Sequence, residues 1–314
     1  RGMDGTVADG AGTVGPVTDV ISAAPTSVLP ASLRAMRPRQ WVKNVLVFAA
    51  PVAAGSLLQT TVLVNSLLAF VAFCLASSSV YLINDIRDVE ADRLHPRKRF
   101  RPIAAGELRP GTAAVLAALC LAAGLAVGWY VAPPLATTLA VYWVLQVAYS
   151  VFLKDQPIID LAMVSAGFLL RAIAGGVASD IPLSQWFLLV ASFGSLFMVA
   201  GKRFSEIVVL GPEAGTRASL ARYTPSYLRF VWEAACVAVV MSYSLWAFEQ
   251  GGDQLWGVGW PAISIAPFTL ALLRYAMVVD AGRAGEPEDV VLSDRVLQVL
   301  AVLWAVPVAL AVFA

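Results

Sequence analysis

Long apolar stretches constrain the fold of this chain more than any other feature of its sequence. Hydrophobic residues account for 59% of its 314 positions and charged residues for only 14%, against about 25% charged residues in soluble domains. A helix needs roughly 20 mostly apolar residues to cross a bilayer, where it satisfies its own backbone hydrogen bonds. The sequence therefore predicts an all-α polytopic membrane protein with nine transmembrane helices. The predicted spans are residues 42–58, 61–83, 112–131, 135–153, 158–178, 185–201, 229–248, 258–279 and 292–313.

Residues 1–33 differ from the rest of the chain in composition. They are rich in Gly, Ala, Asp, Thr and Pro and lack apolar periodicity, which is typical of segments that cannot form a packed core. We expect a disordered leader there, followed by one transmembrane domain over residues 34–314. Within that domain the span 42–58 is the weakest, because Pro51 and Gly55 interrupt it.

The basic residues fall on one side of this predicted topology. Apart from Arg1 in the leader and Arg171 inside a span, every Lys and Arg lies before the first span or near the loops after spans 2, 4, 6 and 8. Cytoplasmic loops carry such an excess of Lys and Arg. The pattern predicts a cytoplasmic N-terminus and a C-terminus outside. The net charge is only +1, so nothing indicates a nucleic-acid partner.

The stretch NDIRDVEADRLHPRKRFRP, residues 84–102, gathers charge at the inner end of the second span. Asn84, Asp88 and Asp92 are spaced i, i+4 and i+8, and Asp85 lies three residues before Asp88. On a continued helix these side chains share one face, where like charges repel one another. A divalent cation reverses that repulsion, and hard oxygen ligands suit Mg²⁺. We predict Asp85, Asp88 and Asp92 as metal ligands; a solvated helix end with local Arg and Glu partners is the alternative.

Basic residues follow these acids directly. Arg97, Lys98 and Arg101 lie in HPRKRFRP, a run that elsewhere acts as a topology signal or a contact for anionic lipids. Beside a carboxylate cluster the run has another use, because carboxylates hold a metal while cations hold the remaining oxygens of a diphosphate. His95 is the only histidine, so the chain offers no Ser-His-Asp set.

Other inner loops repeat the combination of acids and bases. The segments are YSVFLKDQPIID after span 4, GKRFSE after span 6 and RPRQWVKN before span 1. Their candidate site residues are Tyr149, Lys154, Asp155, Asp160, Lys202, Arg203 and Lys43. Pro157 breaks the helix between Asp155 and Asp160, so these two acids need not share a face.

Arg171 is the one charged residue deep inside a predicted span. It follows Asp160 by 11 residues, about three helical turns, so the two share a face. A charge at that depth normally faces a polar cavity or a partner. Arg171 can reach toward the site as a substrate contact or act as a buried structural arginine, and the sequence leaves both roles open.

These motifs resemble one family of membrane proteins. NDIRDVEAD, followed by RP and G and by a Tyr–Lys–Asp motif two spans later, is similar to the UbiA-type intramembrane prenyltransferase superfamily over residues 35–314. The resemblance implies a bundle of nine spans. It also implies that Mg²⁺ on two Asp-rich motifs binds an isoprenyl diphosphate, whose prenyl group passes to an aromatic acceptor.

Three further segments are similar to one branch of that superfamily, the actinobacterial decaprenyl-phosphate phosphoribosyltransferases. They are MRPRQWVKNVLVFAAP, HPRKRFRPIAAGEL and GKRFSE. This branch implies that phosphoribosyl pyrophosphate (PRPP) is the donor and decaprenyl phosphate the acceptor, in cell-wall arabinan synthesis. It also implies a bacterial plasma membrane, with the active site facing the cytoplasm. The small residues in GFLLRAIAGG favour close helix packing, which permits a homo-oligomer without requiring one.

The resemblance also suggests roles for the candidate residues. Asp85, Asp88, Asp92 and Asn84 would hold Mg²⁺ and the diphosphate, and Asp155 and Asp160 a second metal or the ribose hydroxyls. Tyr149 would shield the reactive centre. The candidate phosphate contacts are Lys43, Arg97, Lys98, Arg101, Lys154, Lys202 and Arg203.

Two other functions stay open. A prenyltransferase that uses a prenyl diphosphate and a small acceptor would share the same motifs. A transporter is more remote, because apart from Arg171 the span interiors contain almost no charged residues.

Overall fold

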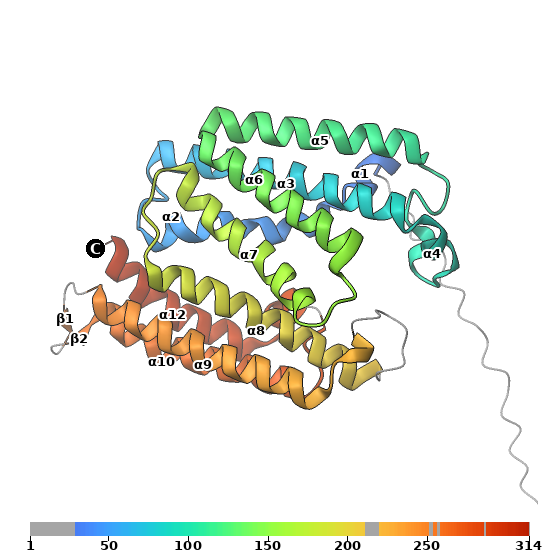
Figure 1. Ribbon diagram of the computed structural model, residues 1–314. Helices are drawn as coiled ribbons and strands as arrows, with labels where there is room; N and C mark the ends of the chain where they lie inside the picture. The colour runs from blue at the N-terminus through green and yellow to red at the C-terminus, as the bar shows by residue number, and fades with distance from the viewer. Residues whose placement is uncertain (1–28, 211–219, 251–253, 256–257, 286, 314) are drawn as a thin grey trace, which may run out of the picture.

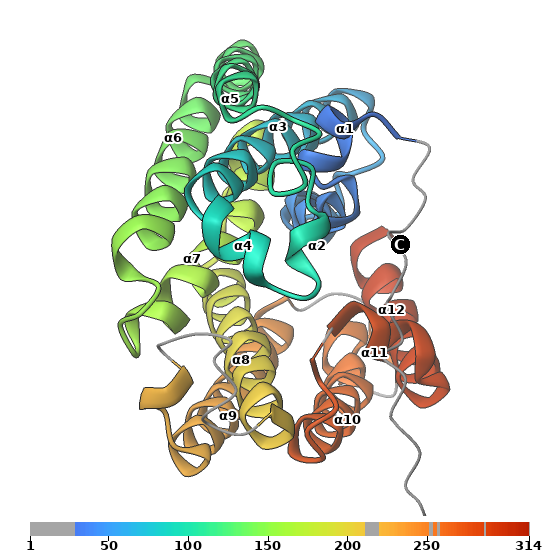
Figure 2. The same ribbon diagram turned by 90° about the vertical axis from the view of Figure 1, so that its right-hand side faces the viewer.

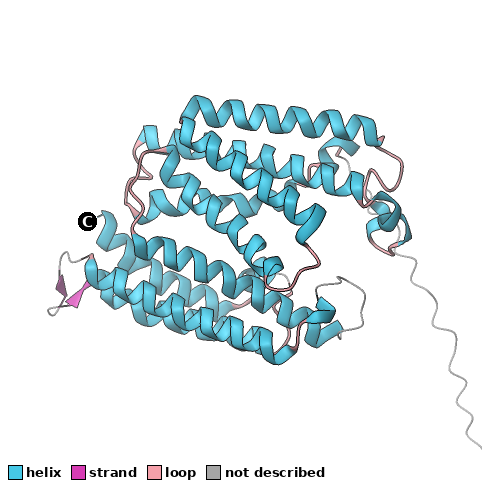
Figure 3. Ribbon diagram, in the orientation of Figure 1, coloured by secondary structure: helices cyan, strands magenta, loops and turns pink. Residues whose placement is uncertain are grey.

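The computed structural model describes residues 29–210, 220–250, 254–255, 258–285 and 287–313. Most of the predicted leader, residues 1–28, lies outside these residues. Within them the fold is helical apart from a hairpin of two short strands, β1 Gln254–Leu255 and β2 Val258–Gly259 (Figure 3). The predicted all-α class is therefore confirmed.

Seven helices among the described residues are long and apolar enough to cross a membrane. They are α3 Thr60–Arg87, α5 Pro110–Val131, α6 Pro133–Ala148, α7 Ile159–Ala178, α8 Gln185–Leu210, α9 Pro225–Glu249 and α10 Trp260–Asp280. Prolines stand in the first turns of α5, α6, α9 and α10, where the missing N–H would have no helical partner anyway. The predicted multi-pass architecture agrees with these helices.

The first and the last of the nine predicted spans are not among these seven long helices. Residues 42–58 form no single long helix; a 3₁₀-helix, η1 Pro38–Phe48, passes into the short α2 Ala49–Ala53. Pro51 has no N–H for a longer helix, and Gly55 has a φ of 65°. The last predicted span corresponds to α12 Arg295–Phe313, of which residues 295–311 form a shorter apolar helix. Nine crossings therefore stay a prediction.

Short elements join the long helices at the end that carries the charged loops. They are α1 Ala31–Ala35, α4 Val89–Leu94, η2 Lys98–Phe100, the π-helix η3 Tyr149–Leu153, η4 Leu220–Arg222 and α11 Pro287–Ser293. The 28 residues of α3 extend about 42 Å at 1.5 Å per residue, which exceeds the roughly 30 Å hydrocarbon core. The last turns of α3 therefore reach beyond an apolar layer of that thickness.

The long helices form two groups (Figures 1 and 2). In one group α3, α5, α6 and α7 pack together with η1 and α2, around a core that includes Phe73, Leu135 and Leu139. In the other group α8, α9, α10 and α12 enclose a core that includes Phe197 and Trp232. Contacts between α7 and α8 join the two groups.

Helix α7 and η1 approach each other closely at Gly175. A Cβ atom placed on Gly175 would lie 1.8 Å from the Val47 carbonyl oxygen, far inside van der Waals contact. The absence of a side chain at Gly175 is what allows η1 to lie against α7.

We therefore expect Gly175→Ala to destabilise the fold by about 1–3 kcal/mol, the usual cost of overpacking. Thermal unfolding of the purified protein in detergent measures the loss. Gly111→Ala is the matched control, because a Cβ at Gly111 meets nothing within 4 Å. Equal melting temperatures for the two variants would contradict the close approach.

Candidate active site

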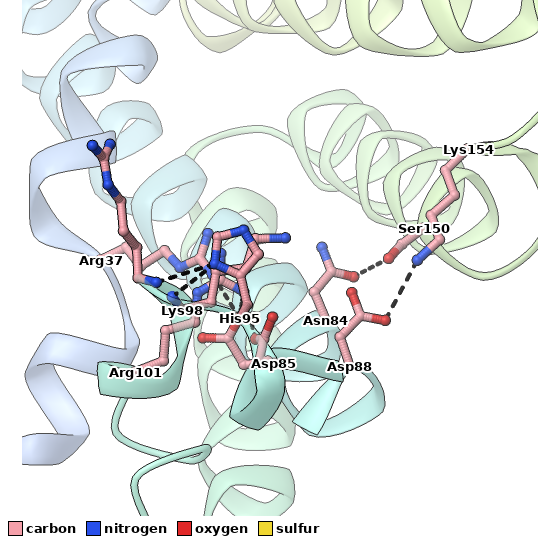
Figure 4. Close-up of polar contacts among 11 residues, drawn as sticks. Arg37, Asn84, Asp85, Asp88, His95, Lys98, Arg101, Ser150 and Lys154 are labelled. Carbon is pink, nitrogen blue, oxygen red and sulfur yellow. Dashed lines mark hydrogen bonds and ion pairs between the residues drawn. The ribbon is translucent and has the colours of Figure 1, made fainter. Parts of the chain in front are cut away.

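The first acidic motif surrounds a break between two helices. α3 ends at Arg87 and α4 begins at Val89, with Asp88 between them. The predicted single helical face is therefore not formed. Asp85 and Asp92 are buried with 2% exposure each, whereas Asp88 is directed toward Lys154. The motif is divided into two neighbouring clusters (Figure 4).

The first cluster joins Asp85 and Asp92 through one arginine. Arg101 NH1 lies 2.6 Å from Asp92 Oδ2 and 3.2 Å from Asp85 Oδ1. Arg37 NH2 donates to the same Asp85 oxygen at 2.5 Å. Arg37 has a φ of 56°, a backbone conformation that is uncommon outside glycine, at the turn between α1 and η1. Two cations from distant segments thus neutralise two buried carboxylates.

The second cluster faces η3. The Asn84 Oδ1 and Ser150 Oγ atoms form a hydrogen bond, and Lys154 Nζ lies 3.4 Å from Asp88 Oδ1. Figure 4 shows Asn84 and Asp88 directed toward Ser150 and Lys154, away from Arg37 and Arg101. About a third of each of the Asp88 and Lys154 side chains is exposed, so this pair is accessible for exchange with a charged substrate.

The second acidic motif forms a buried ion pair. Asp160, with 0% exposure, lies in the first turn of α7 and accepts from Arg203 Nε at 3.0 Å and Arg203 NH2 at 3.1 Å. The Tyr149 hydroxyl donates to the same carboxylate at 2.5 Å, and Arg203 also reaches Glu206 at 3.2 Å. Short π-helices such as the one that carries Tyr149 are frequent at functional sites.

Asp155 does not join this pair. Its side chain is exposed, and among the described residues it forms no hydrogen bond or ion pair. After Pro157 the chain turns at Ile158, whose φ of 68° is unusual for a β-branched residue. The structure therefore brings Tyr149, Asp160 and Arg203 together but leaves Asp155 apart from Asp160.

Tyr223, for which no role is predicted from the sequence, supports this turn. Its hydroxyl accepts the Ile158 N–H at 2.6 Å. Burial raises the pKa of Tyr223 above its ordinary value, so the phenol stays protonated near neutral pH and keeps a proton to donate. Ser150 likewise has no predicted role, because its partner Asn84 lies 66 residues away. Arg37 belongs to the basic segment RPRQWVKN, but its partner Asp85 lies 48 residues away, so the sequence does not predict their pairing.

The remaining basic candidates lie around these clusters. Lys43, Lys98 and Lys202 are partly buried, and Arg97 is exposed. His95 organises the basic loop, because its Nδ1 accepts the backbone N–H groups of Arg97 and Lys98 at 3.2 and 3.3 Å. Figure 4 shows Lys98 beside the cluster of Asp85 and Arg101.

Arg171 lies inside the helix bundle and meets neutral oxygens. It donates to Asn44 Oδ1 at 2.7 Å, to the Gly167 carbonyl at 2.6 Å and to the Tyr142 hydroxyl at 2.9 Å. Its guanidinium also lies 4.8 Å from the Tyr142 ring centroid, a favourable cation–π contact. Its position favours the structural role over a contact with the acidic motifs, because Arg171 links η1, α6 and α7.

The donor chemistry of the first cluster fits Mg²⁺. Within the part of the chain that the structure describes, no group of three His, Cys, Asp or Glu side chains is placed to hold a metal. Mg²⁺ usually needs only one or two carboxylates, because water and substrate phosphates supply its other ligands. Asp85 and Asp92 are such a pair, since both contact the same Arg101 nitrogen.

Comparison with known families defines the class of protein. Residues 45–293 match the UbiA prenyltransferase family, and the chain belongs to this family. It is also 52% identical over 299 residues to a Mycobacterium tuberculosis protein named decaprenyl-phosphate phosphoribosyltransferase, which covers 94% of this chain and 98% of that protein. A protein of the same name from Corynebacterium glutamicum is 50% identical, covering 92% of this chain and 89% of the relative.

Solved structures share the same fold. A UbiA homolog from Archaeoglobus fulgidus bound to DMAPP and Mg²⁺ superposes with a TM-score of 0.67 at 16% identity, covering 90% of this chain and 97% of that one. The apo structure of a UbiA homolog from Aeropyrum pernix K1 gives a TM-score of 0.63 at 17% identity, covering 87% and 98%. These likenesses establish the fold alone.

The two ion pairs should respond differently to substitution. We expect Asp160→Asn to destabilise the protein by about 3–5 kcal/mol, because it leaves Arg203 buried with a weakened partner. Asp88→Asn should cost less than about 1 kcal/mol, because partly exposed pairs contribute little. Thermal unfolding in detergent compares the two variants, and a larger loss for Asp88→Asn would contradict the assignment of Asp160 as the buried structural anion.

Proposed function

We propose that this protein transfers the 5-phosphoribosyl group of PRPP to decaprenyl phosphate, giving decaprenylphosphoryl-5-phosphoribose and pyrophosphate for cell-wall arabinan synthesis. The observation that carries this proposal is the 52% identity, over 94% of the chain, to a protein named decaprenyl-phosphate phosphoribosyltransferase. The geometry supports it, because Arg37, Arg101 and Lys154 concentrate positive charge around the carboxylates of the first motif. PRPP carries a 5-phosphate as well as a diphosphate and so needs many cationic contacts.

The reaction exchanges one bond at ribose C1 for another. The bond from C1 to the pyrophosphate oxygen breaks, and its electron pair leaves with the pyrophosphate. An oxygen of the acceptor phosphate then supplies the electron pair of the new bond to C1. The acceptor is already anionic, so it needs positioning more than a general base. A site whose single histidine shapes a loop is consistent with this chemistry.

The residues of the first motif would bind the leaving group. Asp85 and Asp92, with Asn84 and Asp88, would hold Mg²⁺, which when bound neutralises charge that develops on the departing pyrophosphate. Arg101 and the other basic residues of the inner loops would contact phosphate oxygens through charge-assisted hydrogen bonds. These further contacts are Lys43, Arg97, Lys98, Lys154 and Lys202.

The second motif would shape the ribose side of the site. Arg203 holds the Asp160 carboxylate, which accepts from the Tyr149 hydroxyl. We assign Tyr149 to the reactive centre and Asp160 to its orientation. Asp155, which is exposed, would contact the ribose hydroxyls or a second metal.

The membrane arrangement follows from where the substrates dissolve. We infer nine crossings of the bacterial plasma membrane, with the N-terminus and the active site on the cytoplasmic side. The distribution of Lys and Arg supports this orientation. A water-soluble donor then reaches the site from the cytoplasm, and the lipid acceptor reaches it from the bilayer. A homo-oligomer and the disordered leader stay predictions.

A second function is favoured by the solved relatives. UbiA homologs from Archaeoglobus fulgidus are solved bound to DMAPP or GPP with Mg²⁺, so a prenyl diphosphate is the rival donor. Thermal stabilisation of the purified protein separates the two donors: PRPP should raise the melting temperature, and geranyl diphosphate should not. The reverse result would favour prenyl transfer.

Asp88 offers a direct test of the site. We expect Asp88→Ala to lower radiolabel transfer from PRPP to decaprenyl phosphate by roughly 100-fold, the scale for removing one group that stabilises developing charge. Glu90→Ala is the matched control, because Glu90 is exposed and pairs only with Arg93 in the described structure. Near-normal transfer by well-expressed Asp88→Ala membranes would contradict the assignment.

Metal removal tests the cofactor separately. We expect chelation of divalent ions with EDTA to abolish transfer and added Mg²⁺ to restore it, because Mg²⁺ would neutralise the charge that develops on the departing pyrophosphate. The assay is the same radiolabel transfer in washed membranes. Full activity in EDTA would exclude Mg²⁺ from the proposed mechanism.

A further inference from the structure

A groove of about 470 Å³ lies between α3, α5 and α6. This volume falls within the roughly 300–1,000 Å³ typical of small-molecule sites. Its lining is apolar except for a few side chains, and Arg87 is the one charged residue in it. The lining residues are Ser79, Ile83, Ile86, Arg87, Ala114, Ala117, Ala118, Leu121 and Trp143.

The shape of the groove follows from the small side chains of α5. Ala114 and Ala118 are exposed and one turn apart, opposite Ile83 and Ile86 of α3. Only 22% of the apolar window of α5 is buried, so this helix lies at the outside of the bundle, as Figure 2 shows. A hydrocarbon chain in the bilayer can therefore enter the groove from the side.

The groove also has a direction. From Ser79 to Arg87, α3 rises about 12 Å at 1.5 Å per residue. The part of the groove near Ser79 is mostly apolar, and Arg87 lies at the other end, where α3 carries the acidic motif. This distribution matches an amphiphile with an apolar chain and an anionic head.

Arg87 connects the groove to the candidate active site. Its NH1 atom donates to the Ser150 carbonyl oxygen, and the Ser150 hydroxyl bonds with Asn84. Within the described residues Arg87 forms no ion pair with a carboxylate, in contrast to Arg37 and Arg101. A guanidinium has five N–H donors, so Arg87 retains donors for an anion.

We propose that this groove binds the isoprenoid chain of the polyprenyl phosphate acceptor and that Arg87 binds its phosphate. The proposal rests on the proposed function, because it assigns the acceptor of that reaction to a surface. In a polyprenyl phosphate the phosphate is attached directly to one chain, so it reaches Arg87 while the chain fills the groove. A phospholipid separates its phosphate from two chains by glycerol and fits a narrow single groove less well.

A photoreactive acceptor tests where the chain lies. The full chain in phosphatidylcholine nanodiscs is irradiated with a polyprenyl monophosphate that carries a diazirine in its chain, and the labelled residues are mapped. We expect label on residues 79–87 of α3 and 114–121 of α5, and competition by decaprenyl phosphate. Label confined to other helices, or equal competition by phosphatidylglycerol, would overturn the proposal.

Filling the groove gives a matched pair of variants. Ala118→Phe should lower labelling at least ten-fold because its ring occupies the groove. Val115→Phe places the same ring on an exposed position of α5 outside the lining and should leave labelling unchanged. If Ala118→Phe does not fold, Ala114→Leu, a smaller substitution in the same lining, replaces it as the groove-filling variant. Unchanged labelling in the folded groove variant would contradict the site.

The proposed contact between Arg87 and the acceptor phosphate is tested by a separate variant. Arg87→Gln should weaken the apparent affinity for the probe about ten-fold, whereas Arg93→Gln, at an exposed pair with Glu90, should not. Wild-type protein that labels in the groove but transfers no phosphoribosyl from PRPP would refute the proposed function and leave the groove as a polyprenyl phosphate site. Transfer without labelling of the groove would refute the groove alone.

Discussion

The pairing of two buried carboxylates with one guanidinium organises the charged end of this protein. Unpaired buried charges cost several kcal/mol, so Asp85 and Asp92, each 2% exposed, require Arg101. Arg101 belongs to the basic loop HPRKRFRP, residues 95–102. Arg37, which precedes η1, reaches the same Asp85 oxygen as Arg101. The end of α3, the basic loop and the segment before η1 are therefore held in one arrangement. Under the proposed function the same cations would also contact the phosphates of the donor.

A second buried pair connects the two groups of helices. Arg203 of α8 holds Asp160 of α7 with two hydrogen bonds, and Tyr149 of η3 joins the same carboxylate. Between this pair and the first cluster lie the contacts of Asn84 with Ser150 and Asp88 with Lys154. Of these two contacts, the pair of Asp88 and Lys154 is the more exposed, whereas Ser150 is buried. The groove that contains Arg87 lies beside them, because Arg87 donates to the Ser150 carbonyl oxygen.

Much of this site was accessible from the sequence because its acids and bases are close together in short motifs. The spacing of Asp85, Asp88 and Asp92 predicts the candidate segment, and the composition predicts the long helices that the structure contains. The expectation of one continuous acidic face was wrong, because the helix breaks at Asp88. Asp155 and Asp160 were paired by proximity in the sequence, but the turn at Ile158 directs Asp160 to Arg203. Tyr223 and Ser150 received no role, since an isolated Tyr or Ser in a loop carries no pattern.

The sequence alone determined that this is a helical membrane protein with its charge gathered in a few loops between apolar stretches, because apolar length and composition are local properties of the chain. Local spacing also predicts which residues offer metal and phosphate ligands. The tertiary structure decided which cation meets which carboxylate. These partners are 48 residues apart for Arg37 and Asp85 and 43 apart for Asp160 and Arg203, so the choice depends on how the helices pack. Packing also left Arg87 without a carboxylate partner among the described residues, beside an apolar groove, and no motif in the chain predicts that.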